Sequence, residues 1–453
     1  MAYQKRLTPR PADIFIISLG CPRNLVDTEV LAGILKKRGF SVSFDFNENA
    51  VCIVNTCGFI EDAKQESIDV ILELVSFKKE KRIKKLIVTG CLSQRYSRQI
   101  AREIPQIDGV FGCGTFHRIP DYIERILAGE KTEKIEDPPT FLYNDATPRE
   151  MITPPHSVYV KIQEGCMNYC SFCAIPRMRG KFRSREEISV LREISRFKKN
   201  KTAEINFIGQ DTTLYGVDIY GRKALSSLLE KASRIMKTGW IRLLYTHPAH
   251  YTKELINTVK NEAAVCKYLD LPIQHITDKI LKRMNRRVTK KKIASLIEFL
   301  RKSVPGIAIR TTVMVGFPGE SEKDFRELEN FVREVKFERL GAFMYSREEG
   351  TGAYDFDGQV AESAKKERFD RIMRLQQGIA GEVNAAYIGR TLKVLIDEKD
   401  KSAAGEYTGR TEYDAPEVDG TVRVKSGAPL KEGDFADVKI EGVLEYDLTG
   451  SVV

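Results

Sequence analysis

The chain contains 453 residues, of which 42% are hydrophobic and 30% are charged, with a formal net charge of +10. This length is too great for one compact core and predicts two to four domains. No stretch reaches the roughly 18 apolar residues that a membrane span requires. The basic start MAYQKRLTPRPAD also lacks the apolar run of a secretory signal. These features exclude a membrane-spanning or secreted protein and predict a soluble cytoplasmic one without a membrane partner.

The nine cysteines point to metal or redox chemistry. Disulfide frameworks are rare in the reducing cytoplasm, so clustered cysteines are expected to be metal ligands or redox groups. The positive net charge would suit a nucleic acid partner, but a sum over the whole chain does not locate the charge. The class of partner therefore depends on where the charged residues lie.

The first part of the chain alternates short apolar runs with helical patterns. Strands are expected in DIFIISLGC, AVCIVNTC, KKLIVTGC and GVFGCG, and helices in NLVDTEVLAGILKKRG and IEDAKQESIDVILELVSFKK. This alternation predicts a parallel sheet covered by helices. We assign a flavodoxin-like or Rossmann-like α/β domain to residues 11–125. The weakly patterned, proline-rich stretch that follows is predicted to be a linker at 126–154.

A second alternation is assigned to a domain at residues 155–386. Its six expected strands are VYVKIQEG, EINFIG, WIRLLYT, YLDLPIQ, IAIRTTVMVG and RLGAFMYS. Six β/α units are fewer than the eight of a closed barrel, which predicts an open, partial (β/α)6 barrel. A long charged helix is expected over 361–389. The strand patterns TLKVLID, EYTGRT, GTVRVK and DFADVKIEGV then predict a small all-β barrel at 387–453.

Three cysteines, Cys166, Cys170 and Cys173, follow the first strand of the central domain. In β/α barrels the C-terminal ends of strands are where active sites are built. A structural zinc ion would need four ligands, but no further Cys or His stands at a suitable distance, and His156 is expected at the opposite end of the strand. Three thiolates fit an iron–sulfur cube better, because they leave one iron without a protein ligand. The alternative is three cysteines that merely fill space.

The spacing C-x3-C-x2-C, with Phe172 before the last cysteine, resembles the signature of the radical S-adenosylmethionine (SAM) enzymes. This resemblance implies that the open iron chelates the amino and carboxylate groups of SAM, and that one electron releases a 5′-deoxyadenosyl radical. The strand-end segments NFIGQD, IRTTVMVGFPGE and MYSREEGT match places where the superfamily holds SAM. The implied SAM-contacting residues are Gln210, Asp211, Arg310, Thr312, Gly316, Glu320, Tyr345 and Ser346. Alternatively, GFPGE is only a turn and Arg310 a member of a surface ion pair.

A second set of cysteines, Cys21, Cys57 and Cys91, lies far apart in sequence, but each member directly follows an expected strand. Because parallel strands share their C-terminal edge, the three thiols are expected to converge. The sequence therefore predicts a second three-cysteine cluster with an open iron, against the alternative of three separate core cysteines.

Three other cysteines are expected to have no metal. Cys52 lies inside an expected strand and Cys266 just before one, which is typical of core residues. Cys113 ends a fourth strand of the N-terminal sheet and would close the second site if it were a ligand. We expect a structural role for it instead.

The order of the three domains and both cysteine sets resemble the methylthiotransferase family of radical SAM enzymes over nearly the whole chain. The resemblance implies two 4Fe-4S clusters, held by the two cysteine sets, and SAM as cofactors, with no catalytic residue beyond the clusters. It also implies a one-electron donor of the flavodoxin or ferredoxin type and a C-terminal TRAM barrel, similar to an OB-fold, that recognises the substrate. The reaction of the family replaces an unactivated C–H bond by C–S–CH3.

Members of this family act on adenosine in tRNA or on an aspartate of small-subunit ribosomal protein S-twelve. Residues 387–453 contain nine Lys/Arg and fourteen Asp/Glu, a net charge of −5, so the remainder of the chain carries +15. An acidic recognition module would repel phosphates and attract a basic protein. The alternative is a solvated acidic face without a role in recognition.

The segments EYDAPEVDG, LEYDLTG, QDTTLYG and YTHPAHY resemble the ribosomal-protein, RimO-like branch, whereas the tRNA branch would be expected to carry GQN at 209–211. Thr449 departs from the Trp that is frequent in the branch. We therefore predict methylthio transfer to the β-carbon of an aspartate in protein S-twelve. The basic loop RMRGKFRSR at 177–185 keeps open methylthiolation of isopentenyl- or threonylcarbamoyl-adenosine in tRNA, unless it balances an anionic cluster. A non-catalytic iron–sulfur RNA-binding protein is the alternative of another class.

Overall fold

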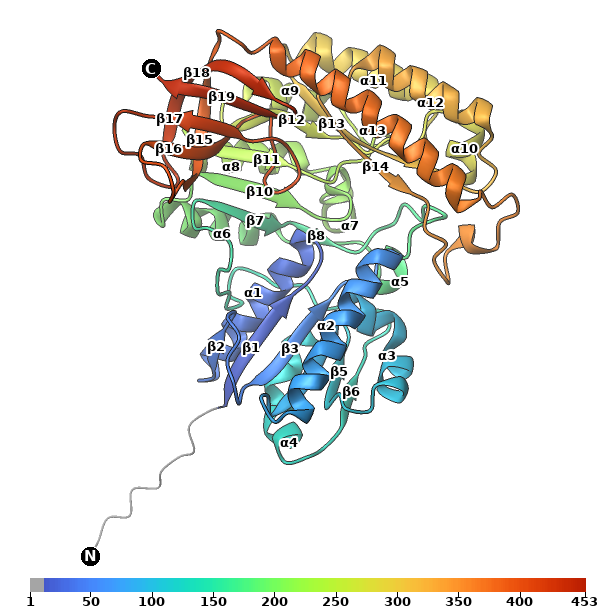
Figure 1. Cartoon of the computed structure of the whole chain (residues 1–453), viewed down its shortest axis with the longest axis vertical. Coiled ribbons are helices and arrows are strands. Elements are labelled where there is room, and N and C mark those ends of the chain that lie inside the picture. The colour runs from blue at the N-terminus through green and yellow to red at the C-terminus, as the bar shows by residue number, and fades with distance from the viewer. Residues whose placement is uncertain (1–11) are drawn as a thin grey trace, which may run out of the picture. The chain divides into compact units, whose positions relative to one another are not determined.

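The computed structural model describes residues 12–453, so the predicted domain start at residue 11 lies just outside the described part. The chain forms two compact units (Figure 1). The first contains the residues up to Ile152 together with Ala174–Lys181, and the second contains Thr153–Cys173 and Phe182–Val453. No helix within 12–453 has the length and apolar character needed to cross a membrane.

A six-stranded parallel sheet in the order β2-β1-β3-β4-β5-β6 forms the centre of the first unit. Its strands are β1 (Asp13–Ser18), β2 (Ser41–Ser43), β3 (Val51–Thr56), β4 (Lys85–Gly90), β5 (Gly109–Phe111) and β6 (Thr132–Lys134). The helical segments are α1 (Pro22–Lys37), α2 (Glu61–Lys79), α3 (Cys91–Glu103), the 3-10 helix η1 (Phe116–Asp121), α4 (Ile123–Leu127) and α5 (Ile175–Arg179). Every residue of β3 is buried, as expected for a central strand covered by helices on both faces.

The segment predicted to be a linker, 126–154, is largely part of this unit. It contributes β6, which pairs in parallel with β5. Farther along, the Nε of Arg149 donates to the buried carboxylate of Glu29 at 2.9 Å. A Cβ added at Gly33 of α1 would lie 2.4 Å from the backbone nitrogen of Arg149. Long-range contacts such as these order the irregular backbone of the segment against α1.

The second unit contains a six-stranded parallel sheet in the order β14-β13-β12-β11-β10-β7. Its strands are β7 (Ser157–Lys161), β10 (Glu204–Ile208), β11 (Trp240–Leu243), β12 (Val265–Asp270), β13 (Ala308–Val315) and β14 (Arg339–Met344), with a short hairpin of β8 (Gln163–Glu164) and β9 (Arg183–Ser184). The helices are α6 (Glu187–Lys199), α7 (Val217–Tyr220), α8 (Leu225–Met236), α9 (Lys253–Asn261), α10 (Asp278–Arg283), α11 (Lys290–Ser303), α12 (Glu322–Val335) and α13 (Glu362–Ala385), with 3-10 helices η2 (Thr212–Leu214) and η3 (Gly352–Asp355). The sheet runs from β14 to β7 without closing, which confirms the predicted partial barrel.

A closed five-stranded barrel follows in the same unit, drawn in red in Figure 1. Its strands are β15 (Thr391–Lys399), β16 (Glu406–Thr411), β17 (Val422–Lys425), β18 (Phe435–Leu444) and β19 (Asp447–Val452). Alternate residues of β17 and β18 are buried, as in a barrel with one face in its core. β19 was not predicted, because its first residue, Asp447, belongs to the acidic segment LEYDLTG, which we interpreted as part of the recognition module.

Buried ion pairs join this barrel to the central sheet. The guanidinium of Arg410 in β16 donates to Glu204 of β10 at 2.9 Å, and Arg242 of β11 donates to the same carboxylate at 2.9 Å. Burial alone would raise the pKa of Glu204, but the two arginines outweigh it and lower that pKa to about 2. Asp397 also accepts from Arg410 at 2.8 Å, so two arginines and two carboxylates balance one another at this junction.

The acidic segment EYDAPEVDG makes further contacts of this kind. Asp414 accepts from the Nε of Arg339 at 2.8 Å, Asp419 accepts from the Nε of Arg310 at 3.2 Å, and Glu412 accepts from the backbone of Lys267 at 2.8 Å. Asp414 is only 2% exposed. The interpretation of this segment as a surface that attracts a basic protein is therefore wrong for these three carboxylates, which hold the barrel against the sheet.

Loss of one partner from these pairs should destabilise the second unit. Replacing Arg339 by methionine leaves the Asp414 carboxylate buried without its cation, which is expected to cost about 3–5 kcal/mol in the free energy of unfolding. Chemical denaturation measures this free energy. The control is Lys336→Met, which breaks the solvent-exposed pair Lys336–Glu382 and should cost at most about 1 kcal/mol. Equal losses in the two variants would show that the buried pair has no special role.

Candidate functional site

The structure places Cys21, Cys57 and Cys91 at the ends of three adjacent parallel strands. Cys21 is the N-cap of α1 after β1, Cys57 directly follows β3, and Cys91 is the first residue of α3 after β4. A Cβ added at Gly20 would lie 3.0 Å from the Sγ of Cys57, so the backbone before Cys21 runs close to the second thiol. Three thiols from distant parts of the sequence thus gather at one edge of the sheet.

Burial and nearby arginines act in opposite directions on these thiols. Burial raises the pKa of Cys57 to about 11, and the neighbouring Cys91 adds to the effect. At Cys21 the charges of Arg23 and Arg179 outweigh burial and lower the pKa to about 7. A buried thiolate needs a cation beside it, and a cluster of ferric and ferrous iron supplies that charge when it binds.

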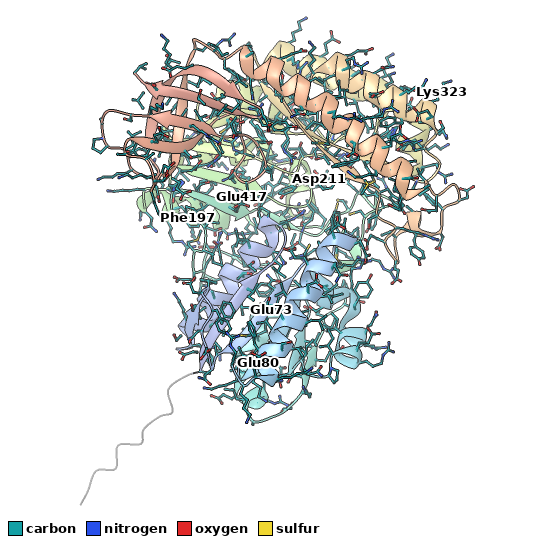
Figure 2. All side chains as sticks on the ribbon, in the orientation of Figure 1. Glu73, Glu80, Phe197, Asp211, Lys323 and Glu417 are labelled. Atoms are coloured by element: carbon teal, nitrogen blue, oxygen red, sulfur yellow. The ribbon has the colours of Figure 1, made fainter. Side chains whose placement is uncertain are left out.

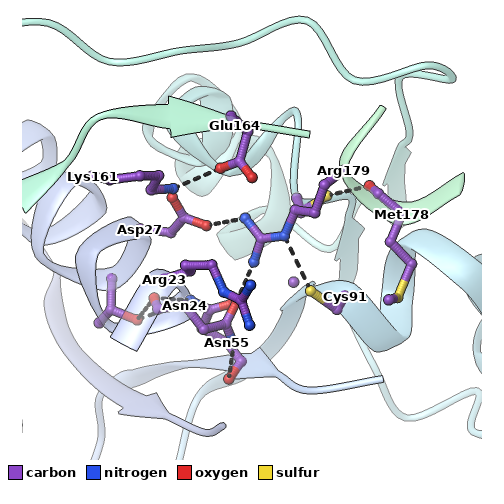
Figure 3. A network of polar contacts seen from close by, with 12 residues as sticks. Arg23, Asn24, Asp27, Asn55, Cys91, Lys161, Glu164, Met178 and Arg179 are labelled. Atoms are coloured by element: carbon purple, nitrogen blue, oxygen red, sulfur yellow. Dashed lines mark hydrogen bonds and ion pairs between the residues drawn. The ribbon is translucent and has the colours of Figure 1, made fainter. Parts of the chain in front are cut away.

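Two arginines donate hydrogen bonds to this triad. The Nε of Arg23 lies 3.4 Å from the Sγ of Cys21, and the Nε of Arg179 lies 3.3 Å from the Sγ of Cys91. Arg179 also pairs with Asp27 and donates to the Oδ1 of Asn24 at 2.8 Å (Figure 3). The contacts of Arg179 were not predicted, because up to 155 residues separate it in sequence from its partners.

Cys113 follows β5, the next strand of the same sheet, and is buried. Its thiol donates to the main-chain oxygen of Met178 at 2.8 Å. This bond is consistent with the structural role expected for Cys113. Cys52 and Cys266 are fully buried within β3 and β12, as expected for core residues.

The second triad, Cys166, Cys170 and Cys173, lies in the loop after β8. Cys166 is buried, and Cys170 and Cys173 are half-buried. The main-chain nitrogen of Cys173 donates to the oxygen of Cys170 at 3.0 Å, which closes the loop into a turn. Burial raises the pKa of Cys166 to about 11, so this thiol also requires a nearby cation to ionise.

Asn168, between the first two of these cysteines, anchors the loop to the ends of β10 and β11. Its Nδ2 donates to Asp211 at 2.7 Å, and its Oδ1 lies 2.8 Å from the Nε2 of His250. Asp211, His247 and His250 also have ligand atoms within 4.8 Å of one another. Asp211, labelled in Figure 2, is 1% exposed. Asp211 and His250 contact Asn168 and so form a hydrogen-bonded support for the cysteine loop, whereas His247 accepts from the main-chain nitrogen of Ala249.

The residues predicted to contact SAM lie in or after β10, β13 and β14, and most already have partners in the chain. Arg310 donates to Asp270 at 3.2 Å and also to Asp419, while the hydroxyl of Tyr345 donates to the oxygen of Ala353 at 3.0 Å. The other predicted residues also form hydrogen bonds within the chain. Asp211 bonds with Thr213 and Asn168, Thr312 with Arg310, and Gly316 with Glu320. Glu320 bonds with Arg368, Ser346 with Glu348, and Gln210 with Glu164. To bind the carboxylate of SAM, Arg310 would have to release one of its two carboxylate partners, Asp270 or Asp419.

Two glutamines near the cysteine loop have buried polar atoms without a partner. Both side-chain polar atoms of Gln163, and the Oε1 of Gln210, make no hydrogen bond among the described residues. A Cβ at Gly209 would lie 2.4 Å from the Nε2 of Gln163, so only glycine fits beside this amide. Unsatisfied buried amides are costly unless a ligand completes them. Gln163 was not predicted as a site residue, although a polar residue at the end of a buried strand can indicate a functional site.

The basic loop 177–185 is less exposed than its composition indicated. Arg179 is 3% exposed and Arg185 is 2% exposed. Arg185 donates to Glu193 at 2.6 Å and to the main-chain oxygen of Lys161 at 3.0 Å. These two arginines are therefore not available to RNA phosphates, whereas Arg177 and Lys181 of the same loop are exposed.

Comparison with known proteins agrees with this arrangement. Three family models match in order: the uncharacterized protein family UPF0004 over residues 13–112, the Radical SAM superfamily over 160–332 and the TRAM domain over 388–453. The ribosomal protein uS12 methylthiotransferase RimO of Desulforamulus reducens is 46% identical over 440 residues, which cover 97% of this chain and 99% of that protein. The chain belongs to the RimO family.

RimO proteins from Clostridioides difficile and Geobacter sulfurreducens are 46% and 44% identical to this chain, each over 440 residues. Among solved structures, the radical SAM methyltransferase TsrM from Kitasatospora setae, with cobalamin and a 4Fe-4S cluster bound, superimposes with a TM-score of 0.54 at 13% identity. That alignment covers 74% of this chain and 72% of TsrM. The likeness confirms the predicted radical SAM fold.

The turn before Cys91 depends on Gly90. We expect replacement of Gly90 to weaken iron binding by the N-terminal triad. Gly90 has φ +103°, and an added Cβ would lie 2.5 Å from both the Oδ1 of Asn55 and the main-chain oxygen of Thr56. Gly90→Ala must displace this turn, so the iron bound per chain after reconstitution should fall. Gly129→Ala is the matched control, because Gly129 has φ +101° but open space around it. Equal iron loss in both variants would attribute the effect to backbone strain alone.

Proposed function

We propose that this chain transfers a methylthio group to the β-carbon of an aspartate in ribosomal protein uS12, the small-subunit protein called S-twelve above. The observation that carries this proposal is the similarity to RimO proteins over 97% of the chain, with two cysteine triads placed at the ends of parallel strands. The target C–H bond is not acidic, so a radical is required rather than a general base. We place the reaction in the cytoplasm.

The two triads are proposed to hold one 4Fe-4S cluster each. Cys21, Cys57 and Cys91 would bind the first, and the donor groups of Arg23 and Arg179 fit an anionic cluster there. The second cluster would be bound by Cys166, Cys170 and Cys173, in the loop that Asn168 anchors. Bound with SAM, this second cluster supplies the radical chemistry, and the electron would come from a flavodoxin- or ferredoxin-type donor.

The chain's own contribution to SAM binding is proposed to lie along the ends of β10, β13 and β14. The free amide atoms of Gln163 and Gln210 offer a donor and acceptors to a polar ligand beside the cysteine loop. Gly316 has φ +72° and its nitrogen donates to Glu320, which shapes the turn after β13. These groups would bind and orient SAM, while Arg310 shapes the sheet through its pairs with Asp270 and Asp419.

The choice of uS12 over tRNA rests on the relatives and not on the net charge. The carboxylates of EYDAPEVDG that pair with the sheet are not available to a partner, and the most buried arginines of the loop 177–185 are not available to RNA. Charge sums therefore support neither substrate. The RimO proteins named above align with this chain across its C-terminal barrel as well, which favours uS12.

A competition assay tests this proposal. The anaerobically reconstituted protein is incubated with SAM, a reductant and sulfide, together with both uS12 and bulk tRNA, and both products are analysed by mass spectrometry. We expect the mass of a methylthio group on one aspartate of uS12 and none on tRNA. Omission of SAM is the control. A methylthio group on tRNA alone would contradict the proposal.

A further inference from the structure

The segment that follows the radical SAM cysteines reaches the N-terminal triad through one side chain. Arg179 is the sixth residue after Cys173 and the last residue of α5. Residues Ala174–Lys181 belong to the same compact unit as the N-terminal sheet. Arg179 is 3% exposed, and its partners Cys91, Asp27 and Asn24 belong to that unit.

Hydrogen bonds link Arg179, directly or through Asn24, to the strand ends that carry all three cysteines. Its Nε donates to the Sγ of Cys91 at 3.3 Å. Its terminal nitrogens pair with Asp27 and donate to the Oδ1 of Asn24 at 2.8 Å. The Nδ2 of Asn24, which is labelled in Figure 3, in turn donates to the main-chain oxygens of Leu19 at 2.7 Å and Thr56 at 3.1 Å, two residues before Cys21 and one before Cys57.

The helix that carries Arg179 is itself fixed in place. Met178 is fully buried, and its main-chain oxygen accepts a hydrogen bond from the thiol of Cys113. Gly180, directly after Arg179, has φ +74°, a conformation that favours glycine, so the chain turns sharply there. A guanidinium held this firmly keeps a constant distance from the cysteine sulfur.

We propose that Arg179 sets the reduction potential of the N-terminal cluster through its hydrogen bond to the ligand sulfur of Cys91 and its buried charge. The inference rests on the proposed binding of that cluster. Reduction adds one negative charge to the cluster, and a fixed cation with a hydrogen bond to a ligand sulfur stabilises the reduced form. Arg179 therefore raises the potential, and Asp27, which pairs with it, moderates this effect.

Arg179 lies on the segment that directly follows the second triad. The loop that holds Cys166, Cys170 and Cys173 continues into α5, and five residues separate Cys173 from Arg179.

The potential can be measured without SAM or substrate. The full-length variant C166A/C170A/C173A should hold only the N-terminal cluster, whose potential is determined by titration with a reductant, followed by absorption and electron paramagnetic resonance. In this parent, R179Q should shift the potential to a more negative value. R179K, which keeps the charge, should lie between the parent and R179Q. D27N, which removes the opposing carboxylate, should shift the potential to a more positive value.

Arg177→Gln is the matched control. Arg177 lies in the same helix and carries the same charge, but it is exposed, so its removal should leave the potential unchanged. The proposal is overturned if R179Q keeps the parent potential with its iron content intact, or if R177Q shifts the potential as much as R179Q does. Should R179Q bind no iron, D27N decides, and a potential at or below that of the parent overturns the proposal. A parent without iron would instead contradict the N-terminal cluster itself.

Discussion

Parallel strand pairing is the constraint on which the rest of this molecule depends. Because β1, β3 and β4 run side by side in the same direction, the residues that follow them share one edge of the sheet. Cysteines separated by more than thirty residues in sequence are thereby gathered into one ligand set. The same rule places the cysteine loop after β7 and β8 beside the loops that carry Asp211 and His250. The two proposed cluster sites thus follow from one geometric principle, applied in two sheets.

Charge in this chain serves internal structure as much as recognition. Asp414 and Asp419 in the C-terminal barrel pair with Arg339 and Arg310 of the central sheet. Arg179 belongs to the loop 177–185, whose composition is typical of a basic surface, but it is buried and contacts Asp27 and the sulfur of Cys91. A net charge, even of a single domain, therefore says little about the partner until the paired residues are subtracted. The likeness to RimO proteins provides the information on substrate that the charge sum does not contain.

The sequence was sufficient for the parts of the structure that depend on local patterns. The buried runs before Cys21, Cys57 and Cys91 are long enough to be predicted as strands, and the strand ends then locate the ligands. Four strands were not predicted, and one of them, β9, has only two residues. β2 and β6 have only three residues each and are held by pairing with a neighbour, while the acidic start of β19 hides its alternation.

The supporting side chains could not be predicted, for a different reason. Asn168 meets His250 across 82 residues, and Arg179 meets Asn24 across 155. No local period indicates such contacts, and amide and guanidinium groups have too many roles for their type alone to be informative. The resemblance to a known family supplied the proposed cluster ligands, whereas the structure supplied the hydrogen bonds of Asn168, Arg23 and Arg179 beside them.

The central claim is that each triad holds its own cluster. The direct measurement is iron and acid-labile sulfide per chain after anaerobic reconstitution of the wild-type protein, C21A/C57A/C91A and C166A/C170A/C173A. The account predicts about eight iron atoms in the wild type and about four in each variant, since a cubane cluster contains four. Loss of all iron in either variant, or the wild-type content in either, would contradict two independent sites.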